Sequence, residues 1–218
     1  MVVGCLIGLA LALLLVGLVS GTVLRHIVQI VPIMVALAVV RRRPNREPLS
    51  MTAPRLYIFS GLPGSGKTTV SEALARHLGA THLRIDTIEQ ALRDLCSIDV
   101  QGEGYRLAYR LALENLRLGN SVVADSCNPI ELTRREWEQV AAAAGAPYIN
   151  IEIICSDSRV LRRRIESRRS TVPNLKLPTW EDVTRREYDP WTADRVVLDT
   201  SNRSEVECLH DLLAKVGA

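Results

Sequence analysis

The chain has 218 residues, enough for one α/β domain of ordinary size with an appendage. A net charge of +3 does not argue for nucleic-acid binding, and an aromatic content of 4% argues against a surface that stacks single-stranded bases. The five cysteines lie far apart and form no C-x-x-C pair or metal-binding spacing, which favours reduced thiols over a disulfide framework.

The first 40 residues are apolar enough to suggest a membrane segment. Residues 2–24 contain no charged residue, and at about 1.5 Å per residue they are long enough to cross a bilayer. After Arg25 and His26 the apolar pattern resumes over residues 27–40. One span followed by an interfacial segment and a two-span hairpin both fit. Both place the basic linker, residues 41–53, on the cytoplasmic side.

This pattern predicts a chain anchored in a membrane through residues 1–40, with a cytoplasmic domain over residues 54–218. An alternative stays open, because Met51 directly precedes the first predicted strand. If translation begins there, the first 50 residues are an error in the assigned gene start and the protein is cytoplasmic.

The next feature is a glycine-rich loop between a predicted strand, Leu56–Ser60, and a predicted helix over residues 68–78. Its sequence matches G-x-x-x-x-G-K-[ST], the phosphate-binding P-loop. Backbone N–H groups of such a loop converge on a polyphosphate, and the helix adds its positive end. The residues expected to bind the nucleotide are Gly61, Leu62, Pro63, Gly64, Ser65, Gly66, Lys67, Thr68 and Thr69.

Two side chains of the loop have separate predicted roles. Lys67 is placed to reach the β- and γ-phosphates of ATP, and the Thr68 hydroxyl to bind Mg²⁺. Lys67 is expected to lie in a solvated loop, so that its removal would abolish phosphoryl transfer and leave the fold intact.

Strands and helices alternate over the rest of the chain. The further predicted strands cover residues 82–85, 121–124, 149–155 and 196–198. The further predicted helices cover residues 87–95, 105–118, 132–144, 158–167, 180–188 and 204–215. This alternation predicts an α/β fold, a P-loop three-layer sandwich with a five-stranded parallel sheet covered on both faces.

Acidic residues follow several of these strands, where active sites of parallel sheets lie. Asp86 follows the second strand and Asp125 the third. Since both strands are expected to flank the P-loop strand, both acids should face the γ-phosphate. Asp125 also has the position of a Walker B acid, which holds Mg²⁺. Capping of the next helix is the simpler role for any of these acids, and we expect it for Asp157 and Asp199.

An arginine-rich helix, residues 158–167, precedes an irregular segment that could act as a lid or substrate loop, residues 171–179. Arg164 and Arg168 share a helix face at i, i+4 spacing. They could close over the phosphates and stabilise charge on the transferring group. A solvated basic face is the alternative interpretation.

Together these residues resemble the P-loop kinase superfamily, and in particular the AAA-type ATP-binding kinases related to the kinase domain of 5′-polynucleotide kinase. The resemblance covers residues 55 to about 215. The matching motifs are residues 61–68, Arg84-Ile85-Asp86, Val123-Ala124-Asp125-Ser126-Cys127-Asn128-Pro129, Arg164-Ile165-Glu166-Ser167-Arg168 and a late Arg186-Glu187-Tyr188-Asp189-Pro190-Trp191.

The resemblance implies that Asp86 is the general base that takes the proton from the accepting hydroxyl. It implies that Asp125 is the acid near the metal and that the lid arginine is Arg164 or Arg168. The family has an arginine three positions after the base, where this chain has Glu89. Because Glu89 would repel a phosphate, a small neutral hydroxylated acceptor such as a sugar, nucleoside or antibiotic is expected.

The sequence therefore predicts an ATP- and Mg²⁺-dependent kinase that phosphorylates a hydroxyl of a small molecule. Two alternatives stay open. One is a 5′-end nucleic-acid kinase, which is possible but not favoured. The other is an ATPase switch that acts on a partner protein.

Overall fold

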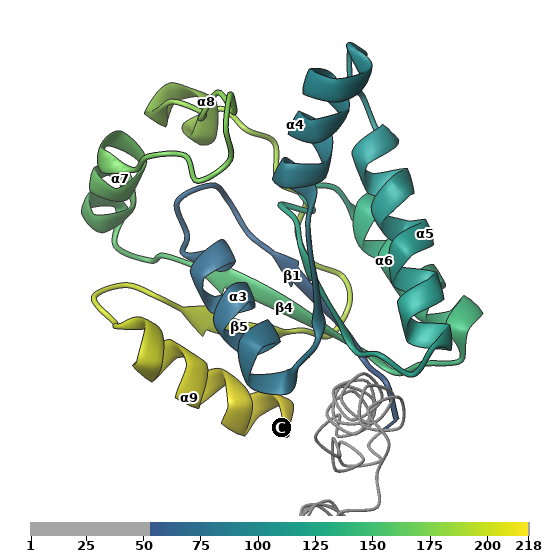
Figure 1. The fold of residues 1–218 in the computed structure, drawn as a ribbon. Coiled ribbons are helices and arrows are strands. Elements are labelled where there is room, and N and C mark those ends of the chain that lie inside the picture. The colour runs from purple at the N-terminus through teal and green to yellow at the C-terminus, as the bar shows by residue number, and fades with distance from the viewer. Residues whose placement is uncertain (1–52, 218) are drawn as a thin grey trace, which may run out of the picture. The chain divides into compact units, whose positions relative to one another are not determined.

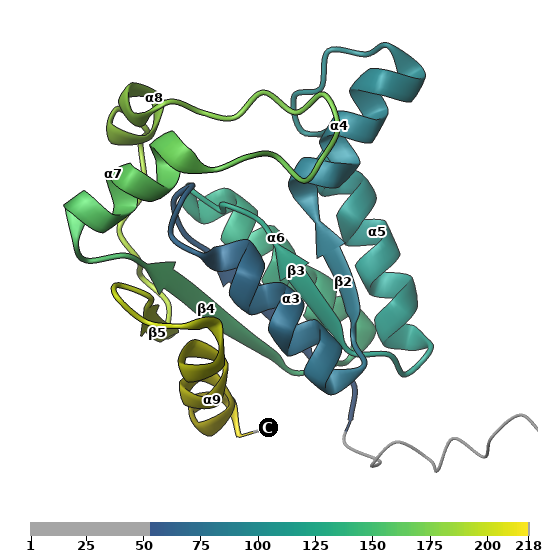
Figure 2. The same cartoon turned by 60° about the vertical axis from the view of Figure 1, so that its left-hand side comes forward.

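The computed structural model describes residues 53–217, which lie within the compact unit Ala53–Ala218. They form a five-stranded parallel sheet with strand order β2-β3-β1-β4-β5 and helices on both of its faces (Figures 1 and 2). The predicted α/β fold with a five-stranded parallel sheet is confirmed.

The strands are β1 Leu56–Ser60, β2 Thr81–Arg84, β3 Val122–Asp125, β4 Tyr148–Ile154 and β5 Val196–Asp199. The helices are α3 Lys67–Leu78, α4 Ile85–Cys96, α5 Glu103–Arg117, α6 Glu131–Ala144, α7 Ser158–Ser167, α8 Trp180–Thr184 and α9 Glu205–Val216.

The central strand β1 is buried along its whole length because its side chains alternate between two hydrophobic cores. Tyr57 and Phe59 pack in the core that α3 and α9 cover, while Leu56 and Ile58 pack in the core under α5 and α6. Figure 2 shows these helix pairs on opposite sides of the sheet. β1 is thereby held in place from both faces, and the loop that leaves it starts from a rigid point.

Two expectations about the sheet and its helices are wrong. β2 does not flank the P-loop strand, because β3 lies between β2 and β1 and β2 is an edge strand. The helix expected over residues 180–188 ends at Thr184. Its continuation is prevented by tertiary contacts of the next residues, since the backbone N–H of Asp189 bonds to the Pro129 carbonyl at 2.8 Å.

Of the two acids expected to cap a helix, Asp157 does so and Asp199 does not. The Asp157 carboxylate accepts the backbone N–H groups of Arg159 and Val160 and caps α7, as predicted. Asp199 does not cap α9, whose N-cap is Ser204. It ends β5 and accepts a backbone N–H at 3.1 Å from the loop after β4.

The prediction of a membrane-anchored chain is corrected by the structure. None of the helices within residues 53–217 is long and apolar enough to cross a bilayer. Residues 1–40, on which that prediction rested, lie outside the described residues, as does most of the linker. The division of the chain at residues 40 and 53 stays a prediction.

A buried arginine fixes the late segment around residues 188–191. Arg134 of α6 is 3% exposed, and its guanidinium donates hydrogen bonds to the backbone carbonyls of Asn128 and Asp189, both at 2.9 Å. The same group lies over the rings of Tyr188 and Trp191, 4.9 and 4.2 Å from their centroids. Arg134 therefore joins the loop after β3 to residues 188–191, which follow α8.

We predict that Arg134→Lys and Arg134→Ala both destabilise the fold, by about 2–4 kcal/mol for alanine. Lysine keeps the charge but cannot supply the planar fork that reaches several carbonyls at once. Urea unfolding measures the change. Arg135→Ala, at a neighbouring position where the side chain is 66% exposed, is the control and should cost less than about 0.5 kcal/mol. An Arg134→Lys variant as stable as the wild type would show that the fork geometry is unimportant.

Candidate active site

The P-loop between β1 and α3 adopts a conformation that requires glycine. Gly64 and Gly66 have φ angles of +85° and +90°, in the left-handed region that side chains disfavour. A Cβ atom on Gly64 would lie 2.7 Å from Cγ1 of Ile165, because α7 packs directly on the loop. Gly66 is the N-cap of α3 and provides no capping side chain, so the first backbone N–H groups of this helix are open to a bound anion.

Lys67 is not in a solvated loop, contrary to the prediction. It is the first residue of α3, its side chain is 9% exposed, and its Nζ lies 3.5 Å from Oδ1 of Asp125. Burial of the ammonium alone would lower its pKa. Electrostatic attraction to Cys127, Asp125 and Asp86 outweighs burial and raises the pKa of Lys67, so the ammonium stays protonated.

The Asp125 carboxylate lies at the carboxyl end of β3 and is 2% exposed. Two other basic side chains approach its Oδ2, His82 through Nε2 and Arg84 through Nε, both at 4.0 Å. His82 is held mostly neutral, because burial lowers its pKa more than the attraction of Asp125 raises it. Neither oxygen of Asp125 has a hydrogen-bond partner among the described residues. A buried carboxylate whose oxygens accept no hydrogen bond is suited to a cation or its water ligands.

The residues present fit the predicted Mg²⁺ ion. Thr68 lines the same cavity as Lys67 and supplies a hydroxyl oxygen, while Asp125 supplies a carboxylate whose oxygens accept no hydrogen bond. Within residues 53–217 no group of three or more His, Cys, Asp or Glu side chains could hold a metal. One carboxylate and one hydroxyl are the sparse protein ligands typical of Mg²⁺ bound together with phosphates.

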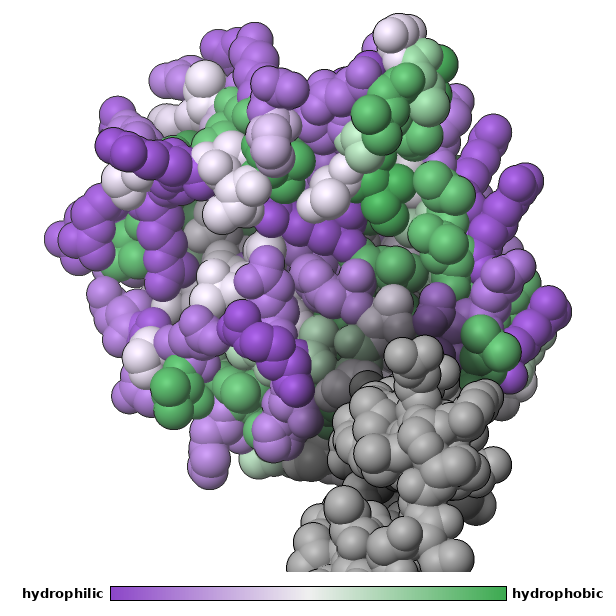
Figure 3. Space-filling view, viewed as in Figure 1, coloured by the Kyte–Doolittle hydropathy of each residue, from purple (hydrophilic) through white to green (hydrophobic). Residues whose placement is uncertain are grey.

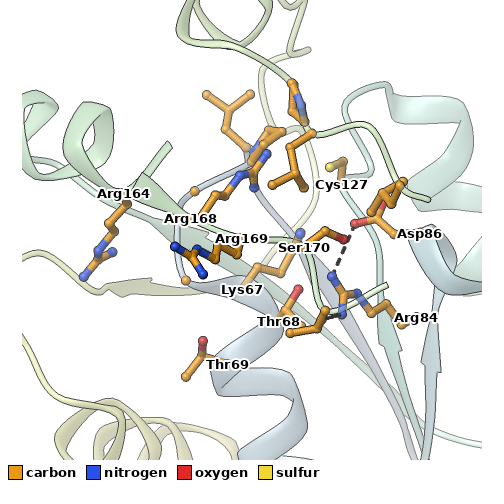
Figure 4. Close-up of a pocket in the computed structure, with 18 of the residues that line it drawn as sticks. Lys67, Thr68, Thr69, Arg84, Asp86, Cys127, Arg164, Arg168, Arg169 and Ser170 are labelled. Carbon is orange, nitrogen blue, oxygen red and sulfur yellow. Dashed lines mark hydrogen bonds and ion pairs between the residues drawn. The ribbon is translucent and has the colours of Figure 1, made fainter. Parts of the chain in front are cut away.

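Asp86 is the second residue of α4 and does not cap it, since the N-cap is Arg84. Its side chain is 51% exposed and its Oδ2 lies 3.9 Å from an Nη atom of Arg84. Figure 4 shows Asp86 on the side of the pocket toward Arg84, with Lys67 and Thr68 between it and Arg164. The carboxyl ends of β2 and β1 bring Asp86 and Lys67 to one cavity even though β2 is an edge strand.

The two candidate lid arginines differ in their contacts. Arg164 donates to Oγ1 and to the backbone oxygen of Thr200, both at 2.8 Å, and Thr200 in turn donates to the backbone oxygen of Ser65 at 2.6 Å. Arg164 thus braces the P-loop from its far side. α7 ends at Ser167, so Arg168 follows the helix with extended backbone and the predicted shared face does not form. Burial lowers the pKa of Arg168, and its buried Nε has no hydrogen-bond partner within the described chain.

The segment of residues 168–178 covers the P-loop and is called the covering segment below. It passes from α7 across to α4 in Figure 2. Two hydrogen bonds attach it to the far side: Arg84 donates to Oγ1 of Thr171 at 2.9 Å, and Asn174 donates to Oδ2 of Asp94 at 3.2 Å. The cavity of about 890 Å³ beneath it contains the P-loop at one end and the first half of α4 at the other.

Several residues of this site were not predicted from the sequence. Arg84 had a detectable signal, since it is a charged residue at the carboxyl end of a strand. Cys127 lines the cavity, and its carbonyl accepts the Gly61 N–H at 3.1 Å. Thr200 gave no signal, because its contacts with Arg164 and the P-loop join positions far apart in the sequence.

Comparison with known proteins agrees with this geometry. A protein family described as AAA domain matches residues 56–190, more than half of the chain. The chain belongs to this AAA domain family. The predicted membership of the P-loop kinases is thereby confirmed, while the more particular resemblance to 5′-polynucleotide kinase stays a prediction.

Individual proteins are similar to this chain over most of their length. A probable adenylyl-sulfate kinase of Aeropyrum pernix is 26% identical over 171 residues, which are 72% of this chain and 91% of that protein. A putative kinase from Chloroflexus aurantiacus has a TM-score of 0.58 at 23% identity, over 77% of this chain and 98% of that one. The APS kinase of Mycobacterium tuberculosis, solved with AMPPNP and APS, has a TM-score of 0.59 at 18% identity, over 76% and 99%. These two structures show the same fold.

The ion pair of Lys67 and Asp125 predicts coupled effects on stability and on nucleotide binding. Lys67→Ala should lower the free energy of unfolding by about 1–3 kcal/mol, because it leaves the Asp125 carboxylate buried with only more distant cations. Adding Asp125→Asn should recover part of that loss, a coupling of about 0.5–3 kcal/mol in a double-mutant cycle. Mg·ATP should stabilise the wild type against heat and Lys67→Ala much less. Additive losses in the double variant would contradict a direct pair.

Proposed function

We propose that this protein is an ATP- and Mg²⁺-dependent kinase that transfers the γ-phosphoryl group to a hydroxyl of a small-molecule acceptor. The observation that carries the proposal is one cavity that contains both a P-loop with a buried, protonated Lys67 and a solvent-accessible carboxylate, Asp86. Membership of a P-loop kinase family supports it. Two of the related proteins are named as kinases of adenylyl sulfate, or APS, which is a small molecule. These names support a small-molecule acceptor.

The residues have distinct roles in the proposed reaction. The loop amides of residues 61–69 and Lys67 hold the phosphates. Asp86 accepts the hydroxyl proton as the new O–P bond forms and the bond between the γ-phosphorus and the ADP oxygen breaks. Arg168, with its unpaired Nε, stabilises charge on the transferring group, whereas Arg164 acts through Thr200 as a positioning residue.

Thr68 and Asp125 would hold Mg²⁺, with Asp125 acting directly or through water. When bound, the ion neutralises charge on the β- and γ-phosphates. Positioning and electrostatics supply most of the rate enhancement in such reactions, so a rigid P-loop matters more than any covalent chemistry of the protein.

Asp86→Asn separates the role of a base from that of a structural residue. The variant keeps the shape and should lose about 10²–10⁴ in kcat, with little change in affinity for Mg·ATP. Asp194→Asn, an exposed position that does not line the cavity, is the matched control and should keep full activity. Near-normal turnover by Asp86→Asn would exclude Asp86 as the base.

A screen of hydroxylated metabolites tests the function itself. ADP release is measured for each metabolite against the background without acceptor, with Lys67→Ala as the blank. The proposal predicts a metabolite that raises ADP release far above background in the wild type and leaves the blank unchanged. ADP release that depends only on an added protein would instead support an ATPase switch. Transfer restricted to 5′-hydroxyl oligonucleotides would support a nucleic-acid kinase.

A further inference from the structure

The acceptor end of the cavity, between α4 and the covering segment, is the part of the site with no assigned ligand. Its neighbourhood is rich in hydrophilic groups: Figure 3 shows hydrophilic residues around α7 and around the hollow between that helix and α4. Apolar residues instead gather over α4 and α5 on the outer surface. The chemistry of the acceptor should therefore be reflected in the charges that line this end.

The acidic residue that argued for a neutral acceptor does not present a free charge. Glu89 is paired with Arg93 one turn further along α4, at 3.3 Å. Burial raises the pKa of Glu89, and Arg93 partly opposes that rise. Gly104 packs against the Glu89 side chain, whose Cδ would lie 3.2 Å from a Cβ at that position. An anion near α4 would therefore meet a compensated pair, and the expected repulsion of a phosphate by Glu89 is not supported.

Basic side chains, in contrast, outnumber their acidic partners in the cavity. Five of them have no carboxylate within 4.0 Å in the described part of the chain: Arg164, which is bound to Thr200, and Arg168, Arg169, Lys176 and Arg186. Arg168 is half-buried with an unpaired Nε, and burial disfavours its charge. Asp182 attracts Lys176 and Arg186 from beyond 4.0 Å, but basic residues still outnumber acidic ones along the cavity, and this excess of positive charge favours the binding of an anion.

Bound nucleotide does not account for all of this charge. The P-loop amides, Lys67 and the metal balance the phosphates of ATP, and Arg168 serves the transferring group. Arg169, Lys176 and Arg186 remain. Two of them belong to the covering segment, which is attached to α4 through Thr171 and Asn174.

We propose that the acceptor carries an anionic group, a phosphate, sulfate or carboxylate, in addition to the hydroxyl that is phosphorylated. Arg169, Lys176 and Arg186 bind that group while Asp86 receives the hydroxyl. The inference rests on the proposed kinase function for the role of the hydroxyl, but the anion-binding subsite can be tested without phosphoryl transfer.

A kinetic test compares acceptors that differ in charge. Ribose 5-phosphate is compared with ribose, and gluconate with glucose, so that a phosphate and a carboxylate are tested separately. The charged member of at least one pair should have a kcat/KM at least about tenfold higher, the effect of one charge-assisted hydrogen bond. In the Arg169→Ala, Lys176→Ala and Arg186→Ala variants the KM for that member should rise about tenfold with kcat little changed. Better use of the neutral members would overturn the proposal.

Arg163→Ala is the matched control, because Arg163 lies on α7, is exposed and does not line the cavity. It should leave the KM for both members of each pair unchanged. A rise in KM equal to that of the three variants would mean that general positive charge, and not the subsite, attracts the acceptor. That result would also overturn the proposal.

A binding test does not depend on catalysis. Protein saturated with Mg²⁺ and AMPPNP, which fills the P-loop, is titrated by calorimetry with inorganic phosphate, sulfate, ribose 5-phosphate and gluconate. At least one anion should bind, more weakly in the triple alanine variant and at higher salt. Anion binding without any phosphorylated acceptor would support the subsite and contradict the kinase. Absence of binding, or equal binding by the triple variant, would overturn the subsite.

Discussion

The buried ion pair between Lys67 and Asp125 is the constraint on which the site depends. A carboxylate that is 2% exposed is costly unless a cation is close, and Lys67 can reach it only if the loop before α3 turns tightly at its glycines. β1 pairs in parallel with β3, and Phe59 lies opposite Asp125. This register fixes how far along the sheet the carboxylate lies relative to the P-loop, which follows β1. Loop conformation, strand pairing and the start of α3 are thus coupled through one interaction.

Around this pair, other contacts join distant parts of the chain to the P-loop. Arg164 and Thr200 support it from the side of β5, and Asn128 donates to the Phe59 carbonyl at 3.0 Å from the side of β3. Arg134 in turn holds the Asn128 carbonyl. The phosphate site is therefore supported from several directions, whereas the acceptor end is bounded by an irregular segment attached at few points. The acceptor end is therefore the less constrained part of the proposed site.

The sequence predicted local features well, because their causes are local. The P-loop, the strands and most helix ends follow from apolar runs and glycines, and their predicted ends lie within a few residues of those observed. Strand order was not predictable in the same way, since no local pattern indicates that β3 separates β2 from β1. The early end of α8 depends on contacts of Asp189 with a loop some sixty residues earlier.

The side-chain contacts of the site were the least predictable. The depth of Lys67 and the attachment of Arg164 to Thr200 arise from tertiary packing. The pairing of Glu89 with Arg93 was visible in their i, i+4 spacing, and attention to it would have weakened the argument for a neutral acceptor.

The destination of the γ-phosphorus of ATP is the most direct test of the central claim. Phosphorus-31 NMR follows that atom in the presence of Mg²⁺ and an acceptor that raises ADP release. The account predicts a new phosphate ester that grows in proportion to ADP, with little inorganic phosphate. Inorganic phosphate as the sole product, at a rate that no acceptor changes, would contradict a kinase and indicate an ATPase.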